Sequence, residues 1–214
     1  MNKKIELVVF DLDGTLTDSG TTIFKAVKAT LKQLGIKGEI TWEKFSLKIG
    51  AHFKEMLAEF NITLDDFELF MSIYKSYYFE YINDTKFYDG VEDTIAALNK
   101  SGIKIALLTT KAQDQADKVI DFLNLRENFD MVTGRRPGLG IKPDAAPLLF
   151  ICSELNIKPE NTMMVGDSEL DINCGKNAGA VSCAVSYGYR KKEDLMKENP
   201  DFIIDSAGEL LKLV

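Results

Sequence analysis

Cysteine and histidine are both scarce in this chain of 214 residues, which contains three cysteines and one histidine. Cys152, Cys174 and Cys183 form no Cys-x-x-Cys or Cys-x-x-His pair, and this spacing argues against a zinc site. Their odd number argues against a disulfide framework. We therefore expect reduced, buried thiols in a cytoplasmic protein.

The sequence is also short of positive charge and of long apolar runs. Lysine and arginine number 26 against 33 aspartates and glutamates, a formal net charge of -7 at pH 7. This balance argues against a nucleic-acid partner, because binding to a phosphate backbone requires clustered cations. No apolar run approaches the ~18 residues of a membrane helix. Glu6 interrupts the N-terminal apolar run, which argues against a signal peptide.

What the chain does contain is an apolar run, residues 7–10, that leads directly into two carboxylates. Residues i and i+2 of an extended segment point to the same side, so Asp11 and Asp13 converge where Gly14 lets the chain turn. Two close carboxylates repel each other unless a cation lies between them. When a hard divalent cation binds between them, one carboxylate is free to attack an electrophile and the other can donate or accept a proton. The alternative is an ordinary Asp-Gly turn after a strand.

Three further polar segments stand at the ends of apolar runs. They are Thr109, which closes the apolar run Ile103–Thr109, then Lys142-Pro143, and finally Gly166-Asp167-Ser168-Glu169-Leu170-Asp171. Together with Asp11-x-Asp13-Gly14-Thr15, their order and spacing resemble the four motifs of the haloacid dehalogenase-like phosphohydrolases over nearly the whole chain. Within that family the sequence is most similar to the phosphoglycolate phosphatase-like branch.

The resemblance implies a role for each acidic residue. Asp11 is the expected nucleophile, which attacks phosphorus and forms an aspartyl-phosphate. Asp13 is expected to protonate the leaving group and then activate water, while its backbone carbonyl helps to hold Mg²⁺. Asp167 is the second expected carboxylate on magnesium. Asp171, one helical turn later, faces the same side and completes the expected metal site, or else orients waters or a neighbouring side chain.

Other residues are expected to contact the phosphoryl group. Thr109 donates its hydroxyl to a phosphoryl oxygen, and Lys142 balances the charge of phosphate and nucleophile. Gly14, Thr15 and Thr110 supply further substrate contacts, through backbone N–H groups after Asp11 and Thr109. Three other cations lie near motif ends, each with a solvated position as the simpler interpretation: Lys111, Arg135 and Arg136.

The pattern of elements predicts an α/β fold with two parts. From residue 87 onward helical and strand patterns alternate, which predicts a doubly wound, Rossmann-like parallel sheet built from residues 1–17 and 87–214. Ligands of such sheets bind beyond the carboxyl ends of the strands, where all four motifs lie. Residues 18–86 read as helices and resemble the helical cap that the family inserts here. A cap can exclude water from the intermediate.

Local signals refine this expectation. Ser19 and Thr63 are predicted to begin helices, and Ser206 with Glu209 to form a capping box. An aromatic stripe over residues 67–81 is interpreted as the core of the helical part. The segment 50–53 resembles the loop through which caps reach toward the site. His52 in it is either an exposed loop residue or a substrate contact.

These patterns favour a magnesium-dependent phosphatase that hydrolyses a small, phosphoglycolate-like phosphomonoester. Inorganic pyrophosphatase and a phosphosugar mutase such as β-phosphoglucomutase are the enzymatic alternatives, although residues 21–25 lack the histidine typical of mutases. Asp13 argues against dehalogenases and phosphonate hydrolases, which replace it. A phosphometabolite-binding regulator is the non-enzymatic alternative, and the intact Asp11, Asp13 and Asp167 argue against it. Neither the substrate nor the oligomeric state follows from the sequence.

Overall fold

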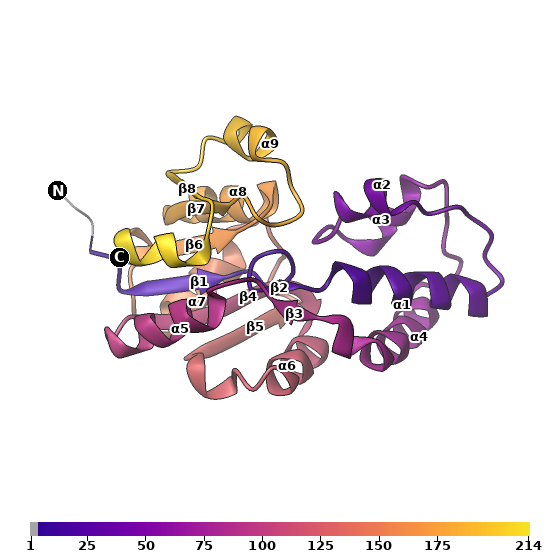
Figure 1. Ribbon diagram of the computed structural model, residues 1–214, viewed down its shortest axis with the longest axis horizontal. Helices are drawn as coiled ribbons and strands as arrows, with labels where there is room; N and C mark the ends of the chain where they lie inside the picture. Colours follow the sequence, from indigo (N-terminus) through magenta and orange to yellow (C-terminus); the bar gives the residue numbers. More distant parts are fainter. Residues whose placement is uncertain (1–3) are drawn as a thin grey trace.

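The computed structural model describes residues 4–214 and has a parallel sheet at its centre (Figure 1). In order across the sheet the strands are β5 (Met131–Arg135), β4 (Lys104–Ala112), β1 (Leu7–Phe10), β6 (Thr162–Gly166), β7 (Val181–Val185) and β8 (Phe202–Ile204). Every neighbouring pair runs parallel. The predicted doubly wound, Rossmann-like α/β fold is therefore confirmed.

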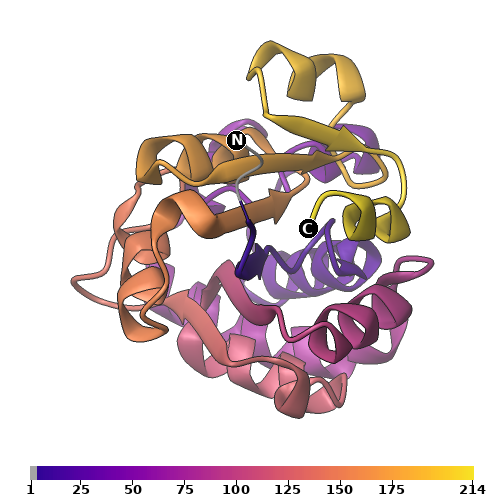
Figure 2. The same ribbon diagram turned by 90° about the vertical axis from the view of Figure 1, so that its left-hand side faces the viewer.

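Helices cover both faces of the sheet because alternate residues of its buried strands point to opposite sides (Figure 2). In β1, Val8 and Phe10 pack into one apolar cluster and Leu7 and Val9 into another. The first cluster takes in α5 (Val91–Lys100), α6 (Gln113–Phe122) and the 3-10 helix Ala207–Lys212; the second takes in α7 (Ala146–Glu154) and α8 (Glu169–Ala178). The shorter elements are α9 (Lys192–Lys197) and the 3-10 helices Arg126–Asn128 and Pro159–Asn161.

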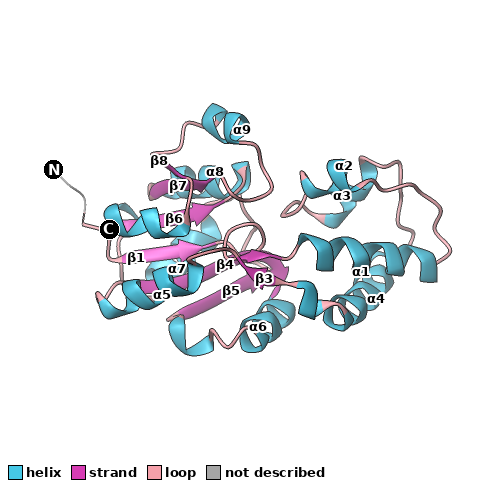
Figure 3. Cartoon of the chain, viewed as in Figure 1, coloured by secondary structure: helices cyan, strands magenta, loops and turns pink. Residues whose placement is uncertain are grey.

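Residues 20–84, here called the helical block, lie at one end of the sheet (Figure 3). The block consists of α1 (Gly20–Gln33), α2 (Trp42–Ser46), α3 (Phe53–Ala58), α4 (Phe67–Glu80) and the 3-10 helix Ile82–Asp84. Tyr74 and Tyr78 of α4 are fully buried, and the ring of Phe53 lies 4.5 Å from that of Tyr74. The aromatic stripe is therefore core of the block, as predicted.

The helical block joins the sheet through a two-stranded antiparallel ribbon, β2 (Thr17–Asp18) with β3 (Lys86–Phe87). The segment that enters the helical block and the segment that leaves it therefore lie side by side. The predicted boundaries at 17/18 and 86/87 fall within this ribbon. The division into two domains stays a prediction.

Two predicted helix caps are wrong. The aromatic helix begins after Asp66 rather than Thr63, because the Asp66 carboxylate accepts a backbone N–H of the first turn at 2.9 Å. The Ser206 hydroxyl makes no capping bond, and Glu209 instead accepts the N–H of Asp205 at 3.0 Å. A side-chain acceptor therefore caps the aromatic helix, whereas the 3-10 helix Ala207–Lys212 begins without one.

Composition also led to expectations about the cysteines and about membrane helices. Cys152, Cys174 and Cys183 are all free and buried. Within residues 4–214, no helix combines the length and the apolar character needed to cross a membrane.

Candidate active site

The carboxyl ends of β1, β4 and β6 meet at the sheet edge that faces the helical block (Figure 1). Phe10, the last residue of β1, pairs with Leu107 of β4 and Val165 of β6. Asp11 and Asp167, which follow these positions closely, are thereby brought together, although 156 positions separate them in the sequence. The sheet order explains why distant motifs form one site.

Three carboxylates gather at this edge. One oxygen from each of Asp11, Asp167 and Asp171 lies within 4.8 Å of the others, and all three residues are buried. Burial raises the pKa of Asp11 to about 7, against the opposing charge of Lys142. Burial also raises the pKa of Asp167 well above its usual value, and the charges of Asp11 and Asp171 add to the effect. A hard divalent cation would relieve this repulsion, so the donor set fits such an ion.

Lys142 links two of these carboxylates. Its Nζ lies 2.5 Å from Asp11 Oδ1, 2.6 Å from Asp171 Oδ1 and 3.0 Å from the Leu108 carbonyl oxygen. These contacts use all three donors of the ammonium group. Burial alone would lower the pKa of Lys142, but the two carboxylates outweigh it and raise the pKa. Lys142 is therefore charged and held in place.

Asp171 is held from both sides. Its Oδ2 accepts the Ser168 hydroxyl at 2.6 Å and the Ser168 N–H at 3.2 Å, which closes a capping box at the start of α8. Its Oδ1 accepts from Lys142. This is the arrangement expected of a residue that orients a neighbour, the alternative weighed for Asp171. Its role as a metal ligand stays a prediction.

Asp13 lies between a hydroxyl and a cation. Ser19 stands at the start of α1 as predicted, but it donates its hydroxyl to Asp13 Oδ1 and makes no side-chain capping bond. Lys111 Nζ lies 2.7 Å from Asp13 Oδ2 and 4.7 Å from the ring centre of Tyr78 in the helical block. The Lys111 side chain is only 7% exposed, so the expectation that it is solvated is wrong. The spacing of two positions from Thr109 places Lys111 on the same face of the strand, but it does not indicate that the helical block covers it.

The loop after β7 holds Asp167, and sequence reasoning missed it. The Tyr189 N–H donates to Asp167 Oδ2 at 2.7 Å. The Tyr189 hydroxyl accepts the N–H of Gly20 at 2.6 Å, at the start of the helical block. A Cβ on Gly188 would come 2.3 Å from Asp167 Cβ and from the Gly14 carbonyl oxygen. Only glycine leaves room for this close approach.

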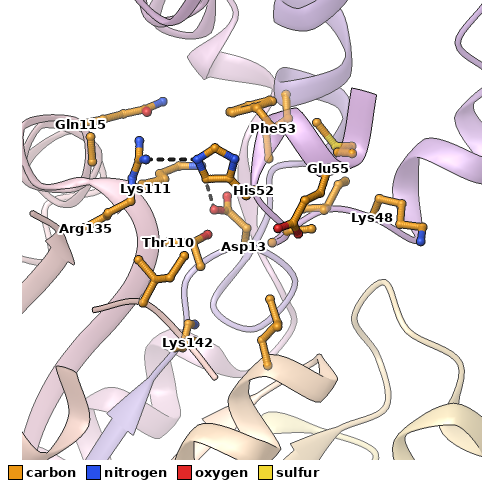
Figure 4. Close-up of a pocket in the computed structure, with 18 of the residues that line it drawn as sticks. Asp13, Lys48, His52, Phe53, Glu55, Thr110, Lys111, Gln115, Arg135 and Lys142 are labelled. Carbon is orange, nitrogen blue, oxygen red and sulfur yellow. Dashed lines mark hydrogen bonds and ion pairs between the residues drawn. The ribbon is translucent and has the colours of Figure 1, made fainter. Parts of the chain in front are cut away.

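A cavity of about 370 Å³ opens between this edge and the helical block (Figure 4). Four of the predicted site residues line it: Asp13, His52, Thr110 and Lys142. The others do not line it: Asp11, Gly14, Thr15, Thr109, Asp167 and Asp171. Thr109 and Thr15 are buried nearby, and the Thr15 hydroxyl has no hydrogen-bond partner in the described chain. The cavity has the size of a small-molecule site.

The helix after Lys142-Pro143 begins at Ala146. The Asp144 carboxylate accepts the N–H of Ala146 at 2.8 Å and so stands before the helix rather than in it. The segment between Pro143 and the helix leaves Lys142 in contact with Asp11.

Comparison with known proteins agrees with this geometry. The family model described as haloacid dehalogenase-like hydrolase matches residues 8–185. A phosphoglycolate phosphatase of Aquifex aeolicus is 32% identical over 212 residues, which cover 98% of this chain and 97% of that protein. The pyrophosphatase PpaX of Listeria innocua is 31% identical over 216 residues, which cover 100% and 98%. A solved haloacid dehalogenase-like hydrolase from Streptococcus pneumoniae has a TM-score of 0.85 at 25% identity, with 97% of each chain covered.

The matched region spans all four motifs and most of the sheet that brings them together. The chain therefore belongs to the haloacid dehalogenase-like hydrolases and is a phosphatase of the subfamily that contains phosphoglycolate phosphatase and PpaX.

Proposed function

We propose that the protein hydrolyses a small phosphomonoester, similar to phosphoglycolate, with the help of Mg²⁺ and through an aspartyl-phosphate on Asp11. The observation that carries this proposal is the buried contact between Asp11 and Lys142 at 2.5 Å, next to a small cavity that Lys142 and Asp13 line. A nucleophile, a cation and an acid–base group are thus available to one phosphoryl group.

In the proposed reaction Asp11 attacks phosphorus in line, and the leaving oxygen departs toward the cavity. Lys142 and the Thr109 hydroxyl balance the charge that spreads over the phosphoryl oxygens. Asp13 gives its proton to the leaving oxygen and then takes one from the water that hydrolyses the aspartyl-phosphate. Ser19 and Lys111 donate to the two oxygens of Asp13 and so fix the orientation of its carboxyl group.

Asp11, Asp167, Asp171 and the backbone carbonyl of Asp13 are the residues that would hold magnesium. When bound, the ion would offset the charge of the buried carboxylates and polarise a phosphoryl oxygen. Thr15 and Thr110 would contribute backbone donors to the phosphoryl group, whereas the Gly14 N–H already donates to the Thr17 carbonyl oxygen at 2.8 Å. The helical block would act as the cap that keeps bulk water away, in a cytoplasmic enzyme.

The direct test is release of phosphate from a panel of substrates, with and without Mg²⁺. 2-Phosphoglycolate represents the proposed class, and pyrophosphate represents the alternative that the Listeria relative's name supports. β-Glucose 1-phosphate, assayed for glucose 6-phosphate, tests the mutase alternative. Binding of these compounds without any turnover would contradict the proposal and favour a phosphometabolite-binding regulator.

Metal exchange is expected to separate binding from catalysis. Magnesium demands near-octahedral geometry, whereas calcium accepts more ligands and bidentate carboxylates, which would engage the oxygen that Asp11 needs for attack. EDTA should therefore abolish activity, and added Mg²⁺ should restore it. Ca²⁺ should allow substrate binding and suppress kcat. Equal kcat with both metals, or full activity in EDTA, would contradict this model.

Gly188→Ala is expected to weaken magnesium binding through Asp167. The new methyl group must displace either Asp167 or the turn at Gly14, and loss of groups that orient ligands typically costs about 10- to 100-fold in metal affinity. The measurement is the Mg²⁺ concentration for half-maximal activity. Gly208→Ala is the matched control, because its methyl group meets nothing within 4 Å. An unchanged Mg²⁺ requirement in Gly188→Ala would argue against Asp167 as a ligand.

A further inference from the structure

Arg135 and His52 meet across the cavity from opposite parts of the molecule (Figure 4). Arg135 ends β5 in the sheet, and His52 stands immediately before α3 in the helical block. Arg135 Nη1 lies 3.3 Å from His52 Nε2, and both residues line the cavity that Asp13 and Lys142 also line. The pair therefore faces the space that a leaving group would occupy.

The donors and acceptors of this pair do not balance. His52 Nδ1 accepts the N–H of Lys54 at 3.3 Å, and Nε2 faces a guanidinium that can only donate. A neutral imidazole has one acceptor nitrogen, so one of these two contacts sets a donor against a donor. Partial burial, followed by the charge of Arg135, lowers the pKa of His52 against the opposing charge of Glu55, and a protonated ring would have no acceptor nitrogen at all. The pair is one acceptor short.

Arg135 also has no carboxylate partner among residues 4–214. Two of the acidic residues that line the cavity are already paired, Glu169 with Arg190 at 2.9 Å and Glu59 with Lys48 at 2.8 Å. His52 is fixed by stacking on Phe67, with ring centres 5.2 Å apart. A guanidinium that lacks a carboxylate partner and lies next to a fixed imidazole is suited to bind an anionic ligand.

We propose that Arg135 and His52 form a receptor for an anionic group on the leaving part of the substrate, a carboxylate or a second phosphate. Such an anion supplies the missing acceptor, because it can accept from Arg135 and from His52 Nε2–H while Nδ1 keeps its contact with Lys54. This inference rests on the proposed function and specifies its substrate class: phosphate compounds whose leaving group carries a second negative charge.

The first test measures binding without turnover. In an Asp11→Asn background, dissociation constants are determined by calorimetry for 2-phosphoglycolate and for ethyl phosphate, which replaces the carboxylate with a methyl group. The parent should prefer 2-phosphoglycolate. Adding Arg135→Gln should reduce this preference by about 10- to 100-fold, the size expected for a lost hydrogen bond to a charged group. Arg135→Lys should restore part of it.

Arg136→Gln is the matched control. It removes the same charge one position away, but Arg136 lies 4.7 Å over the ring of Phe150 and does not line the cavity. The preference for 2-phosphoglycolate should be the same with and without this substitution. Equal preferences in the Arg135→Gln and Arg136→Gln proteins, or no preference in the parent, would overturn the receptor.

Turnover then distinguishes the two sources of the anion. In an otherwise unchanged protein, Arg135→Gln should raise KM more for a substrate with a second negative charge, either 2-phosphoglycolate or pyrophosphate, than for ethyl phosphate. A larger effect on 2-phosphoglycolate indicates a carboxylate, and a larger effect on pyrophosphate indicates a phosphate. If the unchanged protein hydrolyses none of these compounds, the proposed function fails, while the affinity ratio in the Asp11→Asn background still decides whether the receptor exists.

Discussion

Asp11→Asn is expected to lower kcat by at least about 10⁴-fold, because a neutral amide cannot form the acyl-phosphate and loss of an enzyme nucleophile has effects of this order or larger. The fold should persist. An amide has nearly the same shape as the carboxylate, and Lys142 keeps its second carboxylate partner, Asp171, at 2.6 Å. The amide oxygen can still accept from Lys142.

The measurement is steady-state phosphate release together with detection of the phosphorylated enzyme by mass spectrometry. Asp65→Asn, at an exposed position, is the control for a neutralised aspartate. Mass spectrometry also excludes deamidation back to aspartate. Recovery of more than a few per cent of the original kcat without deamidation would contradict a covalent mechanism on Asp11.

The motifs were predictable because each one follows a buried strand. The sequence places Asp11 and Asp167 directly after apolar runs, and parallel strands bring their carboxyl ends to one edge. This topological rule is independent of side-chain packing. It therefore predicts which residues meet, without giving the distances between them.

Contacts made by long side chains were harder to predict. Lys111 and Arg136 have the same appearance in the sequence, a cation near the end of a strand. Lys111 is buried against Asp13 and Tyr78, whereas Arg136 lies over Phe150. The difference depends on the helical block, which covers the end of β4, and a local pattern does not contain that information.

The loop after β7 illustrates a second limit. Tyr189 holds Asp167 through a backbone N–H, which every residue except proline has. Residue type therefore gives no signal for such a contact. Gly188 and Gly14 give an indirect signal of this contact, because a side chain larger than glycine at either position would collide with Asp167. The Arg135–His52 contact likewise joins segments whose approach depends on how the helical block sits on the sheet.

Asp13→Asn is expected to reduce kcat by about 10²- to 10⁴-fold, the usual range for loss of a general acid–base group. The effect should depend on the leaving group. p-Nitrophenolate departs without protonation, so phosphorylation of Asp11 by p-nitrophenyl phosphate should be less impaired than phosphorylation by ethyl phosphate. Hydrolysis of the aspartyl-phosphate should be impaired equally with both substrates, because that step needs Asp13 as a base. Single-turnover kinetics separate the two steps.

The same substitution should also affect stability, in contrast to Asp11→Asn. It leaves the buried ammonium of Lys111 without its carboxylate, and breaking a buried ion pair in this way typically costs about 3–5 kcal/mol. The double variant Asp13→Asn with Lys111→Met removes both charges and should recover most of the unfolding free energy while kcat stays low. Denaturant unfolding measures the first quantity and phosphate release the second. If p-nitrophenyl and ethyl phosphate lose identical factors in the phosphorylation step, Asp13 is not the acid, whatever the stability of the variants.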